Sequence, residues 1–157
     1  MPRVDTLIVV NCTPEEVFAA ITDLDRAPEW LSAIEAVVDQ SNHPPVVGTT
    51  FTEIARFMGK QLRTPKVVTA YDPPRLFSNR STGGPIPQEF TIQLNPFIDG
   101  TEINLTFEAE PSGFFGALPI PVLVLAMKVL LSDNLVVFKK MLEGEREIEN
   151  GELRMEN

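Results

Sequence analysis

The sequence predicts an α+β fold in which a curved antiparallel sheet of about seven strands wraps around a long C-terminal helix. Segments with an apolar period of two run from about residue 34 to residue 110, and only short turns separate them. Sequential strands joined by short turns pair in antiparallel fashion, so these segments form a meander. An amphipathic helical pattern follows at about 122–148, and it is the only element large enough to cover the apolar face of the sheet.

The segment before the meander predicts one strand and two short helices. Residues 3–11 are rich in β-branched side chains, which favours a strand. Thr13-Pro14-Glu15-Glu16 has the pattern of a capping box with proline in the first turn, so a helix begins there and ends near Asp23. A second short helix is expected at 25–31. Glycine and proline turns then divide the sheet into strands at 34–41, 47–58, 60–71, 76–82, 88–95 and 101–110.

The stretch GFFGALPIPVLVLAMKVLL at 113–131 allows three interpretations: a membrane anchor, a core helix or the wall of a pocket. Pro119 and Pro121 interrupt it, and the remaining run is shorter than the roughly 20 residues that a membrane span needs. We therefore expect a core helix and pocket wall, with no stable membrane insertion. Residues 114–121 form a lid, a dimer contact or a membrane-docking patch. The expected inward stripe is Leu123, Met127, Leu130, Leu131, Leu135, Phe138, Met141 and Leu142, and the expected outer face carries Lys128, Ser132, Lys139, Glu143 and Arg146.

Composition and charge exclude several classes of function. The chain has 22 acidic and 13 basic residues and a net charge of −9, without the basic stripe that a nucleic acid requires. One cysteine and one histidine make neither a disulfide nor a usual zinc site, and the sequence contains no phosphate-binding or dinucleotide-binding loop. We expect no metal, no cofactor and no nucleic-acid partner. The N-terminus lacks a signal-peptide pattern, which predicts a cytoplasmic protein with one domain at 1–150 and a frayed tail at 151–157.

The order of elements resembles the helix-grip fold of the START and birch-pollen-allergen superfamily, also called SRPBCC. The resemblance is closest to its bacterial polyketide cyclase/dehydrase and lipid-transport branch. Four stretches carry it: VNCTPEEVFAAITDLDRAPEWLSAI, VGTTFTEIARFMGKQ, VTAYDPPRLFS and DGTEINLTFEAEPSG. Together with the helix that follows, these stretches extend over nearly the whole chain.

The resemblance implies a hydrophobic cavity between the sheet and the helix. Members of this superfamily bind lipids, sterols, polyketides or plant hormones, and some cyclise or dehydrate aromatic polyketides. They share no universal catalytic motif, so the resemblance assigns no catalytic residue. Three hypotheses follow: a carrier or sensor of a hydrophobic small molecule, a cyclase or dehydratase, and a protein-interaction module. A homodimer stays open under each of them.

Strand alternation supplies one candidate catalytic residue, Glu53. It shares parity with Phe51 and Phe57, so its carboxyl would point into the cavity, where a desolvated acid can act as a general base. The alternative is a solvated Glu53 or one paired with an arginine. Asn134 interrupts the apolar helical stripe and either bonds to nearby groups or meets the ligand. The predicted ligand-binding residues are Trp30, Phe51, Phe57, Tyr71, Arg80, Phe90, Ile92, Leu105, Phe107, Met127, Leu131, Asn134 and Phe138.

Overall fold

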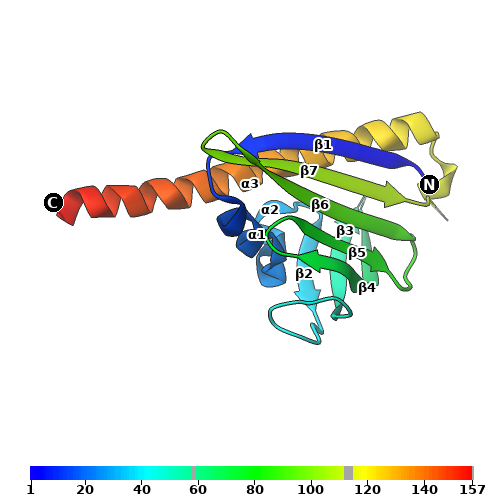
Figure 1. Cartoon of the computed structure of the whole chain (residues 1–157). Coiled ribbons are helices and arrows are strands. Elements are labelled where there is room, and N and C mark those ends of the chain that lie inside the picture. Colours follow the sequence, from blue (N-terminus) through cyan, green and yellow to red (C-terminus); the bar gives the residue numbers. More distant parts are fainter. Residues whose placement is uncertain (58, 112–114, 157) are drawn as a thin grey trace.

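The computed structural model describes residues 1–57, 59–111 and 115–156. Strand β1 (Arg3–Val10) is followed by three short helical segments and then by six more strands and the long helix α3 (Ile120–Glu156) (Figure 1). The short segments are α1 (Pro14–Thr22), the 3-10 turn η1 (Leu24–Arg26) and α2 (Ala27–Trp30). The strands are β2 (Ile34–Val38), β3 (Thr50–Phe57), β4 (Lys60–Asp72), β5 (Leu76–Ser81), β6 (Gln88–Phe97) and β7 (Gly100–Ala109), and the 3-10 turn η2 (Phe115–Ala117) precedes α3.

The seven strands form one antiparallel sheet in the order β1-β7-β6-β5-β4-β3-β2. Strands β2 to β7 follow one another along the sheet, as the predicted meander requires, and β1 joins the far edge beside β7. Figure 1 shows the strongly curved sheet with α1 and α2 at one end of its hollow and α3 running along β1. The predicted helix-grip architecture is therefore confirmed.

Local signals position the helices that close one end of the sheet. Thr13 is the N-cap of α1, and its hydroxyl accepts a hydrogen bond from the backbone N–H of Glu16 at 3.2 Å. Val17, Phe18 and Ile21 of α1 are buried against the sheet. Trp30 at the end of α2 packs on Phe138 of α3, with 4.8 Å between the ring centroids. Helices α1 and α2 therefore fill one end of the concave face with side chains.

The inward face of α3 matches the predicted apolar stripe. Leu123, Met127, Leu131, Leu135, Phe138 and Leu142 are buried, while Leu130 and Met141 are half-buried. The helix is longer than predicted at both ends, and it extends through the expected tail as far as Glu156. Six of the eight residues at 149–156 are glutamate, leucine, arginine or methionine, which have high helix propensity.

Four of the five polar residues expected on the outer face of α3 instead contact β1 or the residue after it, which corrects the prediction. Ser132 bonds to Thr6 at 3.0 Å, and the Lys139 ammonium donates to the carbonyl of Val9 at 2.8 Å. Glu143 accepts from the backbone N–H of Asn11 at 2.9 Å. Because β1 is an edge strand with one unpaired side, these polar side chains cover backbone groups that another strand would otherwise bind.

These contacts perturb the carboxyl of Glu143. Burial alone would raise its pKa, but the N–H of Asn11 and the ammonium of Lys139 outweigh burial. The pKa of Glu143 therefore lies below its usual value, and the carboxylate form is the one that holds α3 to the end of β1. Arg146, one turn further on, donates to the carbonyl of Asn11 at 2.6 Å.

The solvent-exposed surface of α3 carries apolar as well as charged side chains. Its exposed side chains include Val122, Leu125, Val129, Val136 and Val137. By length and composition, Ile120–Ile148 is sufficient to cross a membrane, and 28% of its most apolar stretch is buried in the fold. The run predicted from the sequence is too short to span because it ends at Leu131, whereas the helix continues through a second apolar segment at 135–138.

Candidate functional site: a cavity between the sheet and the long helix

The concave face of the sheet is filled at one end and hollow at the other. Under α1 and the middle of α3, side chains pack into a core that includes Ile92, Leu94, Ile103 and Leu105. Under the first turns of α3, a cavity of about 180 Å³ separates the helix from β3 to β7. Helix α3 approaches the sheet most closely along β1, and it covers the open side of the hollow.

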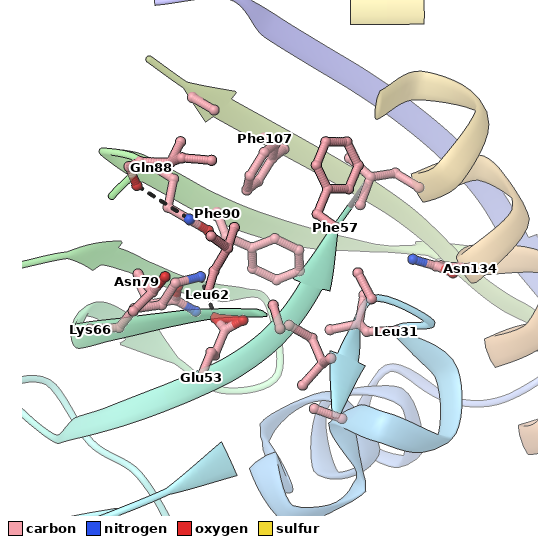
Figure 2. A pocket seen from close by; sticks show the side chains of 18 of the residues that line it. Leu31, Glu53, Phe57, Leu62, Lys66, Asn79, Gln88, Phe90, Phe107 and Asn134 are labelled. Atoms are coloured by element: carbon pink, nitrogen blue, oxygen red, sulfur yellow. Dashed lines mark hydrogen bonds and ion pairs between the residues drawn. The ribbon is translucent and has the colours of Figure 1, made fainter. Parts of the chain in front are cut away.

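Nine of the predicted site residues line this cavity. Glu53 lies on β3, and its side chain points into the hollow as the alternation predicted (Figure 2). The role of these nine residues in binding or catalysis stays a prediction. The nine are Trp30, Phe51, Glu53, Phe57, Phe90, Phe107, Met127, Leu131 and Asn134.

Three predicted ligand contacts are core residues instead, which corrects the prediction. Ile92 and Leu105 are paired neighbours on β6 and β7, and both are fully buried in the end of the hollow that α1 covers. Phe138 lies one turn beyond Asn134 on α3, where Trp30 occupies the space beside it. All three side chains do point inward, as predicted. Strand alternation and helical spacing do not say which end of a curved face is packed.

Arg80 and Tyr71 also lie outside the cavity. Arg80 follows the inward-facing Asn79 on β5, so its side chain lies on the convex face and is exposed. Tyr71 lies after a register shift between Val68 and Ala70, and its ring packs edge-on against Phe18 of α1 with 5.3 Å between centroids. That contact places its phenol at the packed end of the hollow.

Three of the polar side chains that line the cavity form a diagonal row across β3, β4 and β5. Glu53 is paired in register with Thr64, Lys66 with Phe51, and Asn79 with Val68. Each of the three polar side chains is therefore a diagonal neighbour of the next one. Figure 2 shows Glu53, Lys66 and Asn79 together at one end of the cavity.

An ion pair lies at the centre of this row. The Lys66 ammonium bonds to Oε1 of Glu53, and the two side chains are 3% and 14% exposed. The alternative prediction paired Glu53 with an arginine. Glu53 is indeed paired, but its partner is a lysine. Glu53 is thus a cavity-facing carboxylate with an attached cation, not an isolated base.

Lys66 is a functional candidate that sequence reasoning missed. A lysine in a strand is usually solvent-exposed, so its charge suggests the outer face. The usable signal was alternation, because Leu62, Thr64 and Lys66 share one parity and all three line the cavity. Asn79 was also missed because asparagine is usually exposed, although it shares the parity of Phe77, which lines the cavity as well.

Asn134 marks the opposite wall. Its Oδ1 accepts from the hydroxyl and the backbone N–H of Ser32, at 2.9 and 3.3 Å. The amide that interrupts the apolar stripe therefore ties α3 to the segment between α2 and β2, as the simpler interpretation expected. Figure 2 shows it on the far side of the cavity from Glu53, with Phe57, Phe90 and Phe107 on the wall between them.

The chemistry of this site suits binding of an apolar molecule with one polar end. Most of the lining is aliphatic or aromatic, and few polar groups are placed within it, as in small-molecule pockets generally. Among the described residues, no group of three or more histidine, cysteine, aspartate and glutamate side chains could hold a metal ion.

Comparison with known proteins agrees with this geometry. Residues 1–143 match the model of the family described as polyketide cyclase / dehydrase and lipid transport. The chain belongs to this family. No curated protein matches the chain.

Several solved structures are similar to this chain in fold. TTHA0849 from Thermus thermophilus is 21% identical, with a TM-score of 0.78 over 92% of this chain and 99% of that one. A START superfamily protein from Mycobacterium smegmatis is 18% identical, with a TM-score of 0.69 over 92% and 97% of the two chains. The di-domain ARO/CYC StfQ from the steffimycin biosynthetic pathway is 13% identical, with a TM-score of 0.71 over 93% of this chain and 52% of that chain. At these identities the likeness concerns the fold of the polyketide cyclase/dehydrase and lipid-transport family.

Proposed function

We propose that this protein binds a hydrophobic small molecule as a carrier or sensor, in the cavity between the sheet and α3. The observation that carries the proposal is a mostly apolar hollow that contains a buried ion pair at one end. Membership of the polyketide cyclase/dehydrase and lipid-transport family supports it, because the family description covers lipid transport. A lipid or a polyketide-like compound is the class of ligand we expect.

The size of the cavity limits the part of the ligand that can be enclosed. An engineered apolar cavity of about 150 Å³ in another protein binds benzene. The cavity here is somewhat larger, at about 180 Å³. We expect it to enclose one or two fused rings or a short alkyl segment, with any longer part of the ligand emerging between the sheet and α3.

A variant that fills the cavity tests the proposal. Ala55 lines the hollow from β3, and Ala55→Phe places a ring in the space that the ligand would occupy. We expect this variant to bind naphthalene at least about tenfold more weakly than the wild type, a difference of about 1.4 kcal/mol. Titrations followed through the fluorescence of naphthalene provide the measurement.

The matched control is Ala126→Phe, the same substitution at an exposed position of α3 outside the cavity lining. It should bind naphthalene as the wild type does. Equal affinities for the wild type and Ala55→Phe would show that naphthalene binds elsewhere. Native mass spectrometry of freshly purified protein adds an independent test, because a carrier is expected to retain a hydrophobic compound.

A second candidate function is a cyclase or dehydratase reaction on an aromatic polyketide-like substrate. The observation that favours it is the carboxylate of Glu53 inside the cavity, where it could accept a proton. The ion pair with Lys66 weakens this candidate, because the Lys66 ammonium already occupies one oxygen of the carboxylate. Glu53→Gln keeps the shape of the side chain, and unchanged turnover of polyketide-like substrates by this variant would remove Glu53 as the base.

The remaining expectations stay predictions. They are a cytoplasmic location, the absence of a nucleic-acid partner, the absence of stable membrane insertion and a possible homodimer. The exposed apolar face of α3 is relevant to the last two, because large exposed apolar patches often mark interaction surfaces. A protein-interaction role is weakened by the hollow, since that role does not need a cavity.

A further inference from the structure

We propose that the ligand carries a neutral hydroxyl group, as an alcohol or a phenol, and that this group binds at the row formed by Glu53, Lys66 and Asn79. The apolar part of the ligand then extends toward α3. This inference rests on the proposed function and names the chemical class that the cavity selects.

The charge balance of the row disfavours a charged head group. Lys66 is 3% exposed, and the carboxylate of Glu53 already neutralises its ammonium. A ligand carboxylate at this position would leave one buried negative charge without a partner, and such a charge is strongly unfavourable in a low-dielectric site. A neutral group adds no charge to the pair.

The ammonium of Lys66 nevertheless retains donor capacity. A lysine ammonium carries three N–H donors and no acceptor. Within the described part of the chain, Glu53 is its ion-pair partner. A ligand oxygen can therefore accept a further hydrogen bond from Lys66 while the ion pair stays intact.

Asn79 supplies the second observation. Its side chain is 4% exposed and lines the cavity next to Lys66. Its Oδ1 is buried and accepts no hydrogen bond from any of the residues that the structure describes. Buried amide oxygens almost always have a donor, so this atom marks a position where a partner is missing.

A hydroxyl is a simple group that can pair with both Lys66 and Asn79. Its oxygen accepts from an ammonium, and its O–H rotates to donate to an amide oxygen. A carboxylate has no hydrogen to donate to Asn79, and a purely apolar ligand leaves Oδ1 of Asn79 without a donor. The aromatic wall of Phe57, Phe90 and Phe107 lies between this row and Asn134, which fits a ring system attached to the hydroxyl (Figure 2).

Three probes with the same rings test the inference: 2-naphthol, naphthalene and 2-naphthoate, each titrated into the unmodified chain at about pH 7, where 2-naphthol is neutral and 2-naphthoate is charged. We expect 2-naphthol to bind at least about tenfold more tightly than either of the others. Because no residue is changed, the comparison does not depend on whether a variant folds.

A variant then assigns the preference to Asn79. Asn79→Leu keeps the approximate size of the side chain and removes the amide. It should bind naphthalene at least as well as the wild type and lose most of the preference for 2-naphthol. Asn95→Leu is the matched control on an exposed position of β6, and it should retain the full preference.

The outcomes separate this inference from the proposed function. If naphthalene or 2-naphthoate binds as tightly as 2-naphthol, the hydroxyl preference is overturned while the apolar pocket stands. If the preference survives in Asn79→Leu, Asn79 does not bind the hydroxyl group and the inference fails. If none of the three probes binds, the proposed function fails together with the inference.

Discussion

Glu53→Leu is expected to lower the free energy of unfolding by about 3–5 kcal/mol, because it leaves the buried Lys66 ammonium without its partner. The loss is a large fraction of the roughly 5–15 kcal/mol that typically stabilises a domain. Removing both charges in the double variant Glu53→Leu/Lys66→Met should restore most of the stability, since two apolar side chains can replace a buried pair at little cost. Urea unfolding followed by circular dichroism measures all three proteins.

The exposed pair Glu35–Arg56 provides the control on the neighbouring strands β2 and β3. Arg56→Met removes one partner of that pair in water, where the unpaired charge is solvated, so we expect no measurable change. A double variant that is no more stable than Glu53→Leu alone would contradict the explanation. In that case the loss would come from packing rather than from an unpaired charge.

The double variant also bears on the ligand. It converts most of the row into an apolar surface, so the cavity should still accept naphthalene and should lose most of its preference for 2-naphthol. A preference that persisted without Lys66 and Glu53 would assign recognition of the hydroxyl to Asn79 alone.

Phe138→Ala should lower the free energy of unfolding by about 3–5 kcal/mol. The Phe138 ring is 0% exposed and packs on Trp30, so its removal opens a void where α3, α2 and the sheet meet. Loss of this contact should also make α3 less firmly packed over the cavity and weaken naphthalene binding. Urea unfolding and naphthalene titration of the same preparation measure the two effects.

Val137→Ala is the control one residue earlier on the exposed side of α3. Truncation there should change the free energy of unfolding by less than about 0.5 kcal/mol, because no packed neighbour is lost. Similar losses for the two variants would contradict the explanation, because Val137→Ala removes no contact with Trp30.

Several cavity-lining positions could be inferred from local patterns alone. Alternation placed Glu53 and Phe57 on the inner face of β3, and helical spacing placed Met127, Leu131 and Asn134 on the inner face of α3. These inferences succeed because a strand or helix has only one apolar side to bury. Alternation cannot place a residue that follows a register shift, such as Tyr71 after the shift between Val68 and Ala70.

Charge was a misleading guide to position in two places. The polar residues Ser132, Lys139 and Glu143 were assigned to the outer face of α3, but they bind the open edge of β1. Lys66 carries the charge of an ordinary exposed strand lysine, but it is buried beside Glu53. A charged side chain is buried only when a specific partner is available, and that partner lies on another strand.

The sequence by itself determined the elements of this protein, their order and the face that most of them bury, because local periodicity and turn residues encode these features. Only the tertiary structure decided which half of the concave face is packed and which half is hollow, because that depends on where α1 and α2 dock and how α3 is held to β1. The buried row of Glu53, Lys66 and Asn79 likewise exists only once three strands are in register, so no single segment contains it.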